Sequence, residues 1–244
     1  MEYAAISDKG IIREQNEDSW NIVLDLNGNP RAFIVADGMG GHRAGDVASR
    51  MAVEIISEEI SRFIESSNTG SSLFMVFERA VYKANDEIYR YSLECLDGAS
   101  IGTTLTAGII EGNLFTIAHI GDSRFYIVRD GKIKKLTRDH SFVEELVEKG
   151  VLAQEEANNH PLRHQITRAL GYEEQIQVDF CKIEVKKRDI YLFCTDGLTM
   201  KISSSELLST LLQEKTLDEI LKSMVELANE RGGDDNITAI AIRV

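Results

Sequence analysis

Several apolar segments of this 244-residue sequence stop at an aspartate. The pattern occurs at four places: AFIVA before Asp37, LFTIAHIG before Asp122, IYLFCT before Asp196, and Asp235 just ahead of the last apolar segment. Aspartate disfavours strands, so each position taken alone predicts only a turn between two strands. If these strand ends meet at one edge of the sheets, several carboxylates converge there. Carboxylates at such close range need protons or cations between them.

Oxygen ligands of this kind favour hard cations, Mg²⁺ or Mn²⁺, over zinc or copper. Two such ions that share a carboxylate can hold a water between them and lower its pKa, which turns the water into a nucleophile toward phosphorus. The loop REQNED supplies the complement, because the Arg13 guanidinium can hold two phosphate oxygens while Glu17 and Asp18 can orient metal-bound waters. Alone, that loop would be interpreted as a solvated polar turn. The spacing therefore supports a two-metal site as a hypothesis.

Hydrophobic periodicity predicts an α+β protein. Apolar residues recur at helical spacing over 45–64 and 73–93, and two shorter helices are expected within 204–230. Strands are expected at 3–7, 19–26, 32–36, 103–110, 114–120, 124–130, 132–136, 176–185, 190–195 and 236–244. We expect the strands from 103 to 136 to form one meander and those from 176 to 195 to form a hairpin. This order is not the βαβ alternation of a parallel sheet, so mainly antiparallel sheets are predicted.

Composition narrows the function further. A net charge of −13 without a basic stripe disfavours a nucleic acid or an anionic membrane as the main partner. The absence of an 18-residue apolar stretch and of a basic-then-apolar leader predicts a cytoplasmic protein without membrane insertion. Cys95, Cys181 and Cys194 lack C-x-x-C spacing and are expected to be buried thiols. No linker rich in Pro, Gly or Ser divides the chain, so one domain over 1–244 is expected.

Other routes to phosphate chemistry lack their residues. The glycine-rich segment after Asp37 has no lysine where a nucleotide-binding loop needs one. No cysteine begins a C-x5-R signature, and no D-x-D pair offers an aspartyl-phosphate route. A metal-activated water is the nucleophile that remains.

A series of motifs then resembles a known family. R-x-x-N-E-D, A-D-G-M-G-G-H, G-T-T, G-D-S-R, D-H-S, H-P-x-R, I-T-R-A-L-G, T-D-G-L and D-D-N-I-T stand in the order found in the metal-dependent protein phosphatases of type 2C, in their compact bacterial form. The similarity runs from Asp8 to Thr238. It implies a four-layer αββα sandwich of two mainly antiparallel sheets flanked by helices. It also implies dephosphorylation of phosphoserine and phosphothreonine with two Mn²⁺ or Mg²⁺ ions.

The same resemblance implies roles for the metal ligands. Asp37 resembles the carboxylate that bridges the two ions, and Gly38 the residue whose backbone carbonyl binds one of them. Asp196 and Asp235 resemble the other ligands of the second ion. Asp122, together with Asp196, resembles the site of a third and weaker ion.

The residues around the phosphate follow from the resemblance too. Arg13 matches the phosphate-binding arginine, and Asp18 the ligand that acts through a water. Many eukaryotic members carry a general-acid histidine directly after the Asp-Gly pair, where this chain has Met39. His42 is the candidate catalytic acid in its place, and a water on the third ion is the alternative donor.

Residues 137–171 correspond to the flap that lies beside the site in this family and are expected to influence substrate choice. The resemblance implies action on phosphoserine and phosphothreonine proteins, including a bacterial Ser/Thr kinase that the protein opposes. A monomer is expected. Two other functions compete with this reading. One is a catalytically silent module of the same fold that binds phosphoproteins, and the other is a phosphohydrolase of small molecules.

Overall fold

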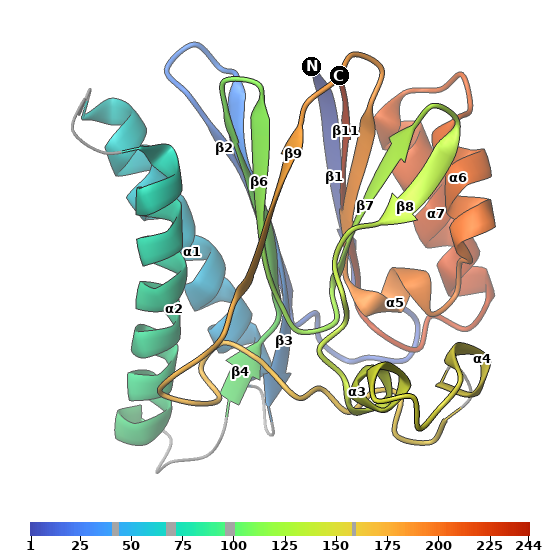
Figure 1. Ribbon diagram of the computed structural model, residues 1–244, viewed down its shortest axis with the longest axis horizontal. Helices are drawn as coiled ribbons and strands as arrows, with labels where there is room; N and C mark the ends of the chain where they lie inside the picture. The colour runs from blue at the N-terminus through green and yellow to red at the C-terminus, as the bar shows by residue number, and fades with distance from the viewer. Residues whose placement is uncertain (41–43, 67–71, 96–100, 158–159) are drawn as a thin grey trace.

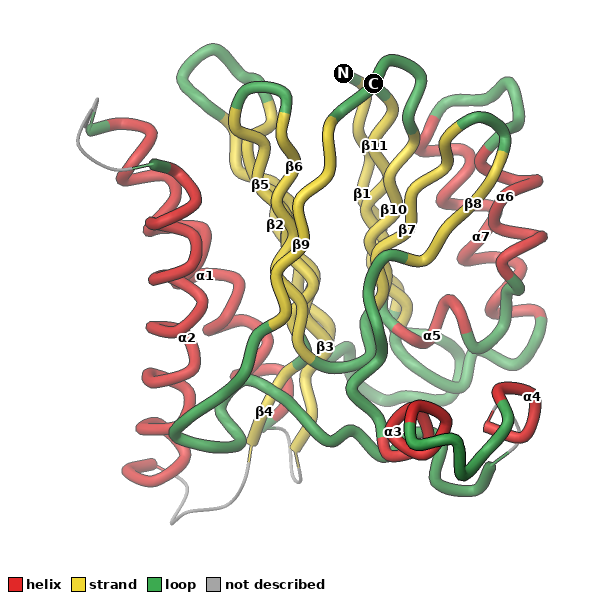
Figure 2. Tube along the Cα trace, in the orientation of Figure 1, coloured by secondary structure: helices red, strands yellow, loops and turns green. Residues whose placement is uncertain are grey.

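Two β-sheets pack face to face, and a layer of helices covers the outer face of each (Figures 1 and 2). The computed structural model describes residues 1–40, 44–66, 72–95, 101–157 and 160–244. The predicted four-layer αββα sandwich is confirmed. Both chain ends lie at the top of the view in Figure 1, while β3 ends and α5 begins at the bottom.

The first sheet contains five strands within the described residues, in the order β1-β11-β10-β7-β8, and neighbouring strands are antiparallel. Its strands are β1 (Glu2–Asp8), β7 (Arg124–Arg129), β8 (Lys132–Lys135), β10 (Ile190–Cys194) and β11 (Ile237–Arg243). The first and last strands of the chain therefore pair with each other, which places the loop after β1 beside the loop before β11.

The second sheet follows the order β2-β3-β5-β6-β9, and the short strand β4 pairs with the end of β3. Its strands are β2 (Asp18–Leu24), β3 (Pro30–Gly40), β4 (Ile101–Thr103), β5 (Leu105–Glu111), β6 (Leu114–Ile120) and β9 (Asp179–Glu184). The hairpin of β2 and β3 turns at Asn27 and Gly28, where Gly28 adopts a left-handed backbone with a φ of +78°.

The helices cover both sheets with their apolar faces. On the second sheet lie α1 (Gly45–Glu65) and α2 (Leu73–Cys95), close to their predicted ranges. On the first sheet lie α5 (Asp196–Thr199), α6 (Ser204–Leu211) and α7 (Leu217–Glu230). A capping box of Thr216 and Glu219 begins α7. The segment 137–171 carries α3 (Phe142–Glu148) and α4 (Gln154–Ala157), and it crosses the bottom of the sandwich in Figure 1.

Aromatic rings fill the space between the two sheets. The Phe115 ring meets the rings of Phe33, Phe125 and Tyr191 edge-on, with centroids 5.0 to 5.9 Å apart. Phe193 completes the group, and all five side chains are fully buried. Because the strands of both sheets point these residues inward, the aromatic layer fixes how the sheets face each other.

Two predicted strand connections are wrong. The chain between β6 and β7, read as part of one meander, passes from the second sheet to the first at the Gly-Asp-Ser turn. The expected hairpin over 176–195 is also absent, since β9 pairs with β6 while β10 pairs with β7 and β11. In each case a turn of hairpin length joins strands of different sheets. Loop length alone does not predict whether the next strand joins the same sheet or the facing one, because both sheets offer similar apolar surfaces.

The three cysteines are free, but only Cys194 is fully buried; Cys181 is partly buried and Cys95 is exposed. The expectation of buried thiols is thus wrong for Cys95, which lies at the end of α2. Among the helices of the described residues, none is long and apolar enough to cross a membrane.

We expect Phe115→Ala to lower the free energy of unfolding by about 3 to 5 kcal/mol, because the rigid aromatic layer cannot collapse into the cavity. Phe74→Ala is the matched control, since Phe74 is only partly buried and packs on Phe180 at the edge of the helix layer. Urea denaturation of both variants measures the difference. Equal losses would show that the aromatic layer has no special weight.

Candidate functional site

The strand-end aspartates converge at the bottom of the sandwich. Burial raises the pKa of Asp37 well above its usual range, and the charges of Asp18, Asp196, Asp122 and Asp235 each raise it further. These residues come from β2, β3, the β6–β7 turn, α5 and the segment before β11. The structure thus brings the four strand-end aspartates and Asp18 near one another.

Asp18 and Asp37 are directly opposite each other in the antiparallel pair of β2 and β3. Like charges at such a position destabilise a sheet. Asp18 is buried, its Oδ2 accepts a hydrogen bond from the Thr195 hydroxyl at 2.9 Å, and its Oδ1 has no hydrogen-bond partner among the described residues. Burial raises the pKa of Asp18 to about 7. A buried carboxylate with one unpaired oxygen is the kind of group that a cation or its water would stabilise.

The first sheet contributes the other two inner carboxylates. Asp196 is the first residue of α5, and burial together with the charge of Asp235 raises its pKa to about 6. Asp122 lies in the turn between β6 and β7 with 7% of its surface exposed. Burial and the charge of Asp196 raise the pKa of Asp122 well above its ordinary value.

Arg13 closes the site on the solvent side. Its Nη2 lies 2.8 Å from Asp235 Oδ2, and its side chain is 51% exposed. Burial raises the pKa of the neighbouring Glu17, an effect that the positive charge of Arg13 opposes. The guanidinium therefore sits at the rim, where it can meet a ligand from solvent.

Asn236 is a site residue that the sequence reasoning missed. Its Nδ2 donates to the carbonyls of Lys9 (2.9 Å) and Gln15 (2.8 Å), and its Oδ1 accepts from Glu17 N–H (2.8 Å). The side chain is buried and ties the loop that carries Arg13 to the start of β11. The sequence did offer a signal for this role. An asparagine follows Asp235 directly, and its side-chain amide can both donate hydrogen bonds to backbone carbonyls and accept one from a backbone N–H.

The glycines after Asp37 and Asp196 serve close backbone approach. A Cβ on Gly38 would lie 2.1 Å from the carbonyl oxygen of Gly45, and a Cβ on Gly197 would lie 2.1 Å from that of Asn236. Neither glycine has a positive φ. Their absent side chains let the neighbouring segments come close enough for the aspartates to converge.

Two threonines hold the backbone of Asp37. Its N–H donates to Thr104 Oγ1 at 2.9 Å, and its carbonyl accepts from Thr104 N–H and from Thr103 Oγ1, both at 2.9 Å. These bonds come from the G-T-T motif, which ends β4 and precedes β5. They fix the end of β3 in one position.

The proposed general acid is not placed by the structure. His42 falls in 41–43, outside the described residues. Met39, at the position where many relatives carry histidine, is a partly exposed residue of β3.

As the side chains lie, no group of three or more His, Cys, Asp or Glu residues in the described part of the chain is arranged to hold an ion. Positive and polar groups stand at the carboxylates instead, namely Arg13 at Asp235 and Thr195 at Asp18. Mutual repulsion keeps such carboxylates apart. The donor set still fits Mg²⁺ or Mn²⁺, because it is all oxygen, acidic and partly unpaired. Asp37, Gly38, Asp196 and Asp235, with Asp122 and Asp18, are the residues that would hold these ions.

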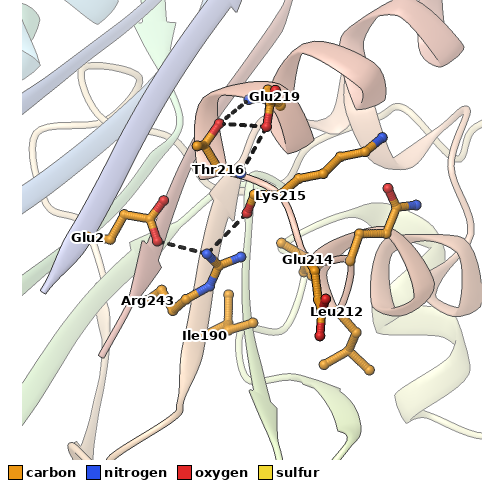
Figure 3. Close-up of a pocket in the computed structure, with 10 residues that line it drawn as sticks. Glu2, Ile190, Leu212, Glu214, Lys215, Thr216, Glu219 and Arg243 are labelled. Atoms are coloured by element: carbon orange, nitrogen blue, oxygen red, sulfur yellow. Dashed lines mark hydrogen bonds and ion pairs between the residues drawn. The ribbon is translucent and has the colours of Figure 1, made fainter.

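A sizeable surface cavity lies elsewhere. It measures about 660 Å³ and lies at the end of the first sheet where β1 begins and β11 ends (Figure 3). Arg243 there donates to Glu2 at 2.8 Å, Glu2 accepts from Leu217 N–H, and Thr216 and Glu219 cap α7. Since these polar groups satisfy one another, the carboxylate site remains the candidate for catalysis.

Comparisons with known proteins show which proteins this chain resembles in sequence and fold. Residues 12–240 match the family model described as protein phosphatase 2C. The serine/threonine phosphatase stp of Listeria monocytogenes serotype 4b is 38% identical over 97% of this chain and 93% of its own. The crystal structure of the Mycobacterium tuberculosis serine/threonine phosphatase PstP/Ppp superimposes with a TM-score of 0.87 at 36% identity, over 98% of this chain and 96% of that one. A structure of the PstP catalytic domain in complex with two manganese ions gives a TM-score of 0.84 at 35% identity, over 99% and 97% of the two chains.

The raised pKa of Asp18 predicts how the metal-free protein depends on pH. A carboxyl whose folded-state pKa is raised from 3.8 to about 7 stabilises the fold below about pH 4 and loses this contribution as the pH rises through 7. The change in the free energy of unfolding caused by Asp18→Asn should therefore be more favourable at pH 8 than at pH 5 in the metal-free protein. Urea denaturation in chelator compares the variant with the wild type. Buried His119, whose pKa is lowered to about 4, makes stability rise with pH in both proteins. Subtracting the wild-type value from the variant value cancels this contribution.

Mn²⁺ should raise the melting temperature at pH 8, by linkage. At free Mn²⁺ of about 100 times Kd, one site adds about 2.7 kcal/mol of stability. Asp37→Asn should lose most of this gain. A wild-type melting curve that does not move with Mn²⁺ would contradict a shared ion site.

Proposed function

This chain belongs to the protein phosphatase 2C family, and on that premise we propose how its carboxylates and Arg13 hydrolyse phosphoserine and phosphothreonine. The protein is a metal-dependent serine/threonine protein phosphatase that uses Mn²⁺ or Mg²⁺ and acts on phosphoproteins. The observation that carries the proposal is that Asp18 lies opposite Asp37 across β2 and β3, with Asp122, Asp196 and Asp235 near enough for their charges to raise the pKa of Asp37.

When bound, the ions supply an activated water for direct attack on phosphorus and positive charge against the phosphoryl oxygens. Asp37 feels the charges of the other four aspartates and would hold the ions together with them. Thr103 and Thr104 hold its backbone rigid, which keeps the nucleophile and the phosphate in line. The Gly38 carbonyl would be a further ligand, and Asp196 and Asp235 would hold the second ion.

Arg13 orients the phosphate. Its guanidinium is engaged by Asp235 at 2.8 Å in the structure. If Asp235 turns to an ion, the N–H groups of Arg13 are free to donate to two phosphate oxygens. Asn236 keeps the loop of Arg13 in place during this exchange.

The leaving alkoxide needs a proton. We keep His42 as the candidate acid, with a water held at Asp122 and Asp196 as the alternative. Asp18 is suited to orient a water through its unpaired Oδ1.

The competing functions have less support. A silent binding module would not need a strained set of carboxylates, and relatives over nearly the whole chain are named serine/threonine phosphatases. A Ser/Thr kinase among the substrates, a monomeric state and a cytoplasmic location stay predictions. So does the division into one phosphatase domain over 1–244 with a flap at about 137–171.

We expect the protein to hydrolyse a phosphothreonine peptide with Mn²⁺, and excess nucleotide not to compete. Asp37→Ala or a chelator should lower kcat/KM by about 10³-fold or more, since the activated water is worth several kcal/mol. Phosphate release in steady state measures both effects. Binding of the peptide without release would favour the silent module, and competition by nucleotide would favour the small-molecule enzyme.

Arg13→Ala should lower kcat/KM for the same peptide by about 10²-fold, because a charged donor to the phosphate is lost. Arg50→Ala is the matched control, since Arg50 is exposed on α1 and pairs with Asp46 one turn away. Mn²⁺ affinity should stay unchanged in both variants. A loss of Mn²⁺ binding in Arg13→Ala would instead assign Arg13 to the metal site.

A further inference from the structure

Two buried histidines beside the site have no role in the chemistry described above. His119 of β6 and His140 at the base of the segment 137–171 are each 2% exposed, and their ring centroids are 4.9 Å apart. A buried imidazole is costly unless its nitrogens find partners. The partners of His140 lie directly next to a proposed metal ligand.

His140 grips the peptide of Gly121 with two hydrogen bonds. The ring Nδ1 of His140 accepts the Gly121 N–H at 3.1 Å, and the backbone N–H of His140 donates to the Gly121 carbonyl at 2.7 Å. Because Nδ1 accepts, the hydrogen-bond network assigns the ring proton to Nε2, which lies 3.2 Å from Asp179 Oδ2. Burial lowers the pKa of His140, which favours the neutral imidazole that this arrangement needs.

Gly121 is a sensitive point of the turn that presents Asp122. Its φ is +103°, and a Cβ there would lie 2.6 Å from Thr104 Cγ2. On the other side of Asp122, Ser123 Oγ lies 2.7 Å from Thr104 Oγ1, the same hydroxyl that accepts the Asp37 N–H. The turn is therefore held by His140 at one end and by Thr104 at the other.

His140 also anchors the segment 137–171. Its carbonyl accepts from Thr167 N–H at 2.8 Å, and the neighbouring Phe142 N–H donates to Gln165 O at 2.8 Å. His119 braces the same base, since its Nε2 lies 2.8 Å from the Arg138 carbonyl. His140 thus contacts the Asp122 turn through its ring and its backbone N–H, and the base of the proposed flap through its backbone carbonyl.

We propose that His140 is a positioning residue that aims Asp122 at its cation through the Gly121 peptide, and so couples the segment 137–171 to that ion. This inference rests on the proposed function, in which Asp122 binds a cation together with Asp196. His140 touches neither substrate nor ion.

The experiment compares two amides at position 140. His140→Asn is short enough to place its oxygen where Nδ1 stands and to accept the Gly121 N–H. His140→Gln is one methylene longer and places its polar group near Nε2, toward Asp179. Calorimetric titration of the protein with Mn²⁺ counts the ions and measures each Kd. His160→Ala is the control, because His160 Nδ1 also accepts a backbone N–H, from Leu162, without a link to Gly121.

We expect His140→Gln to weaken the weakest Mn²⁺ site by about 10- to 100-fold, the usual cost of losing a partner behind a metal ligand. His140→Asn and His160→Ala should keep wild-type Mn²⁺ binding. In an Asp122→Asn background, His140→Gln should cause no further change, because the two residues act on one ion.

Suppose first that Asp122→Asn loses an ion. Wild-type Mn²⁺ binding by His140→Gln, or equal losses in His140→Asn and His140→Gln, would then overturn the role of His140 and leave that of Asp122 standing. An Asp122→Asn variant with unchanged Mn²⁺ binding would overturn the ligand role of Asp122, and the role of His140 with it. His140→Gln could also weaken Mn²⁺ binding by the same factor in the Asp122→Asn background and in the wild type. That result would show that His140 acts on the fold and not through Asp122.

Discussion

Mutual repulsion among carboxylates at one end of the sandwich is the constraint on which the rest of this structure depends. Asp18 and Asp37 face each other across a strand pair, and three more aspartates add their charge. Such an arrangement persists only where the rest of the fold holds it, and the aromatic layer around Phe115 supplies that rigid frame. This repulsion in turn creates affinity for divalent cations, because bound cations neutralise the negative charges that the fold holds close together.

Neutral groups do most of the positioning. Thr103 and Thr104 fix the backbone of Asp37, Asn236 fixes the loop of Arg13, and Gly38 lets the backbone of Gly45 approach. Each of them lies within a few residues of a carboxylate in the sequence or across a strand pair. The site is thus a set of short strand ends whose hydrogen bonds cross from one sheet to the other, as Thr195 does to Asp18.

Local features were predictable where a local interaction decides them. The range of α1 follows from apolar spacing, the β2–β3 hairpin from Asn27 and Gly28, and the start of α7 from its capping box. The connections β6–β7 and β9–β10 were predicted wrongly, because turn length does not distinguish a hairpin from a crossing between sheets. Asn236 and His140 were missed as positioning residues, since their partners lie far away along the chain or depend on how a turn is placed.

By itself, the sequence determined the long helices and most of the strands, which aspartates end strands, and which family the motifs resemble. These properties depend on neighbouring residues and on the order of short patterns. Only the tertiary structure decided that β6 and β7 belong to different sheets and that Asp18 lies opposite Asp37. It also decided that Arg13 meets Asp235. Those facts depend on packing between segments up to the full length of the chain apart, where the burial of one apolar face selects among partners that look alike in the sequence.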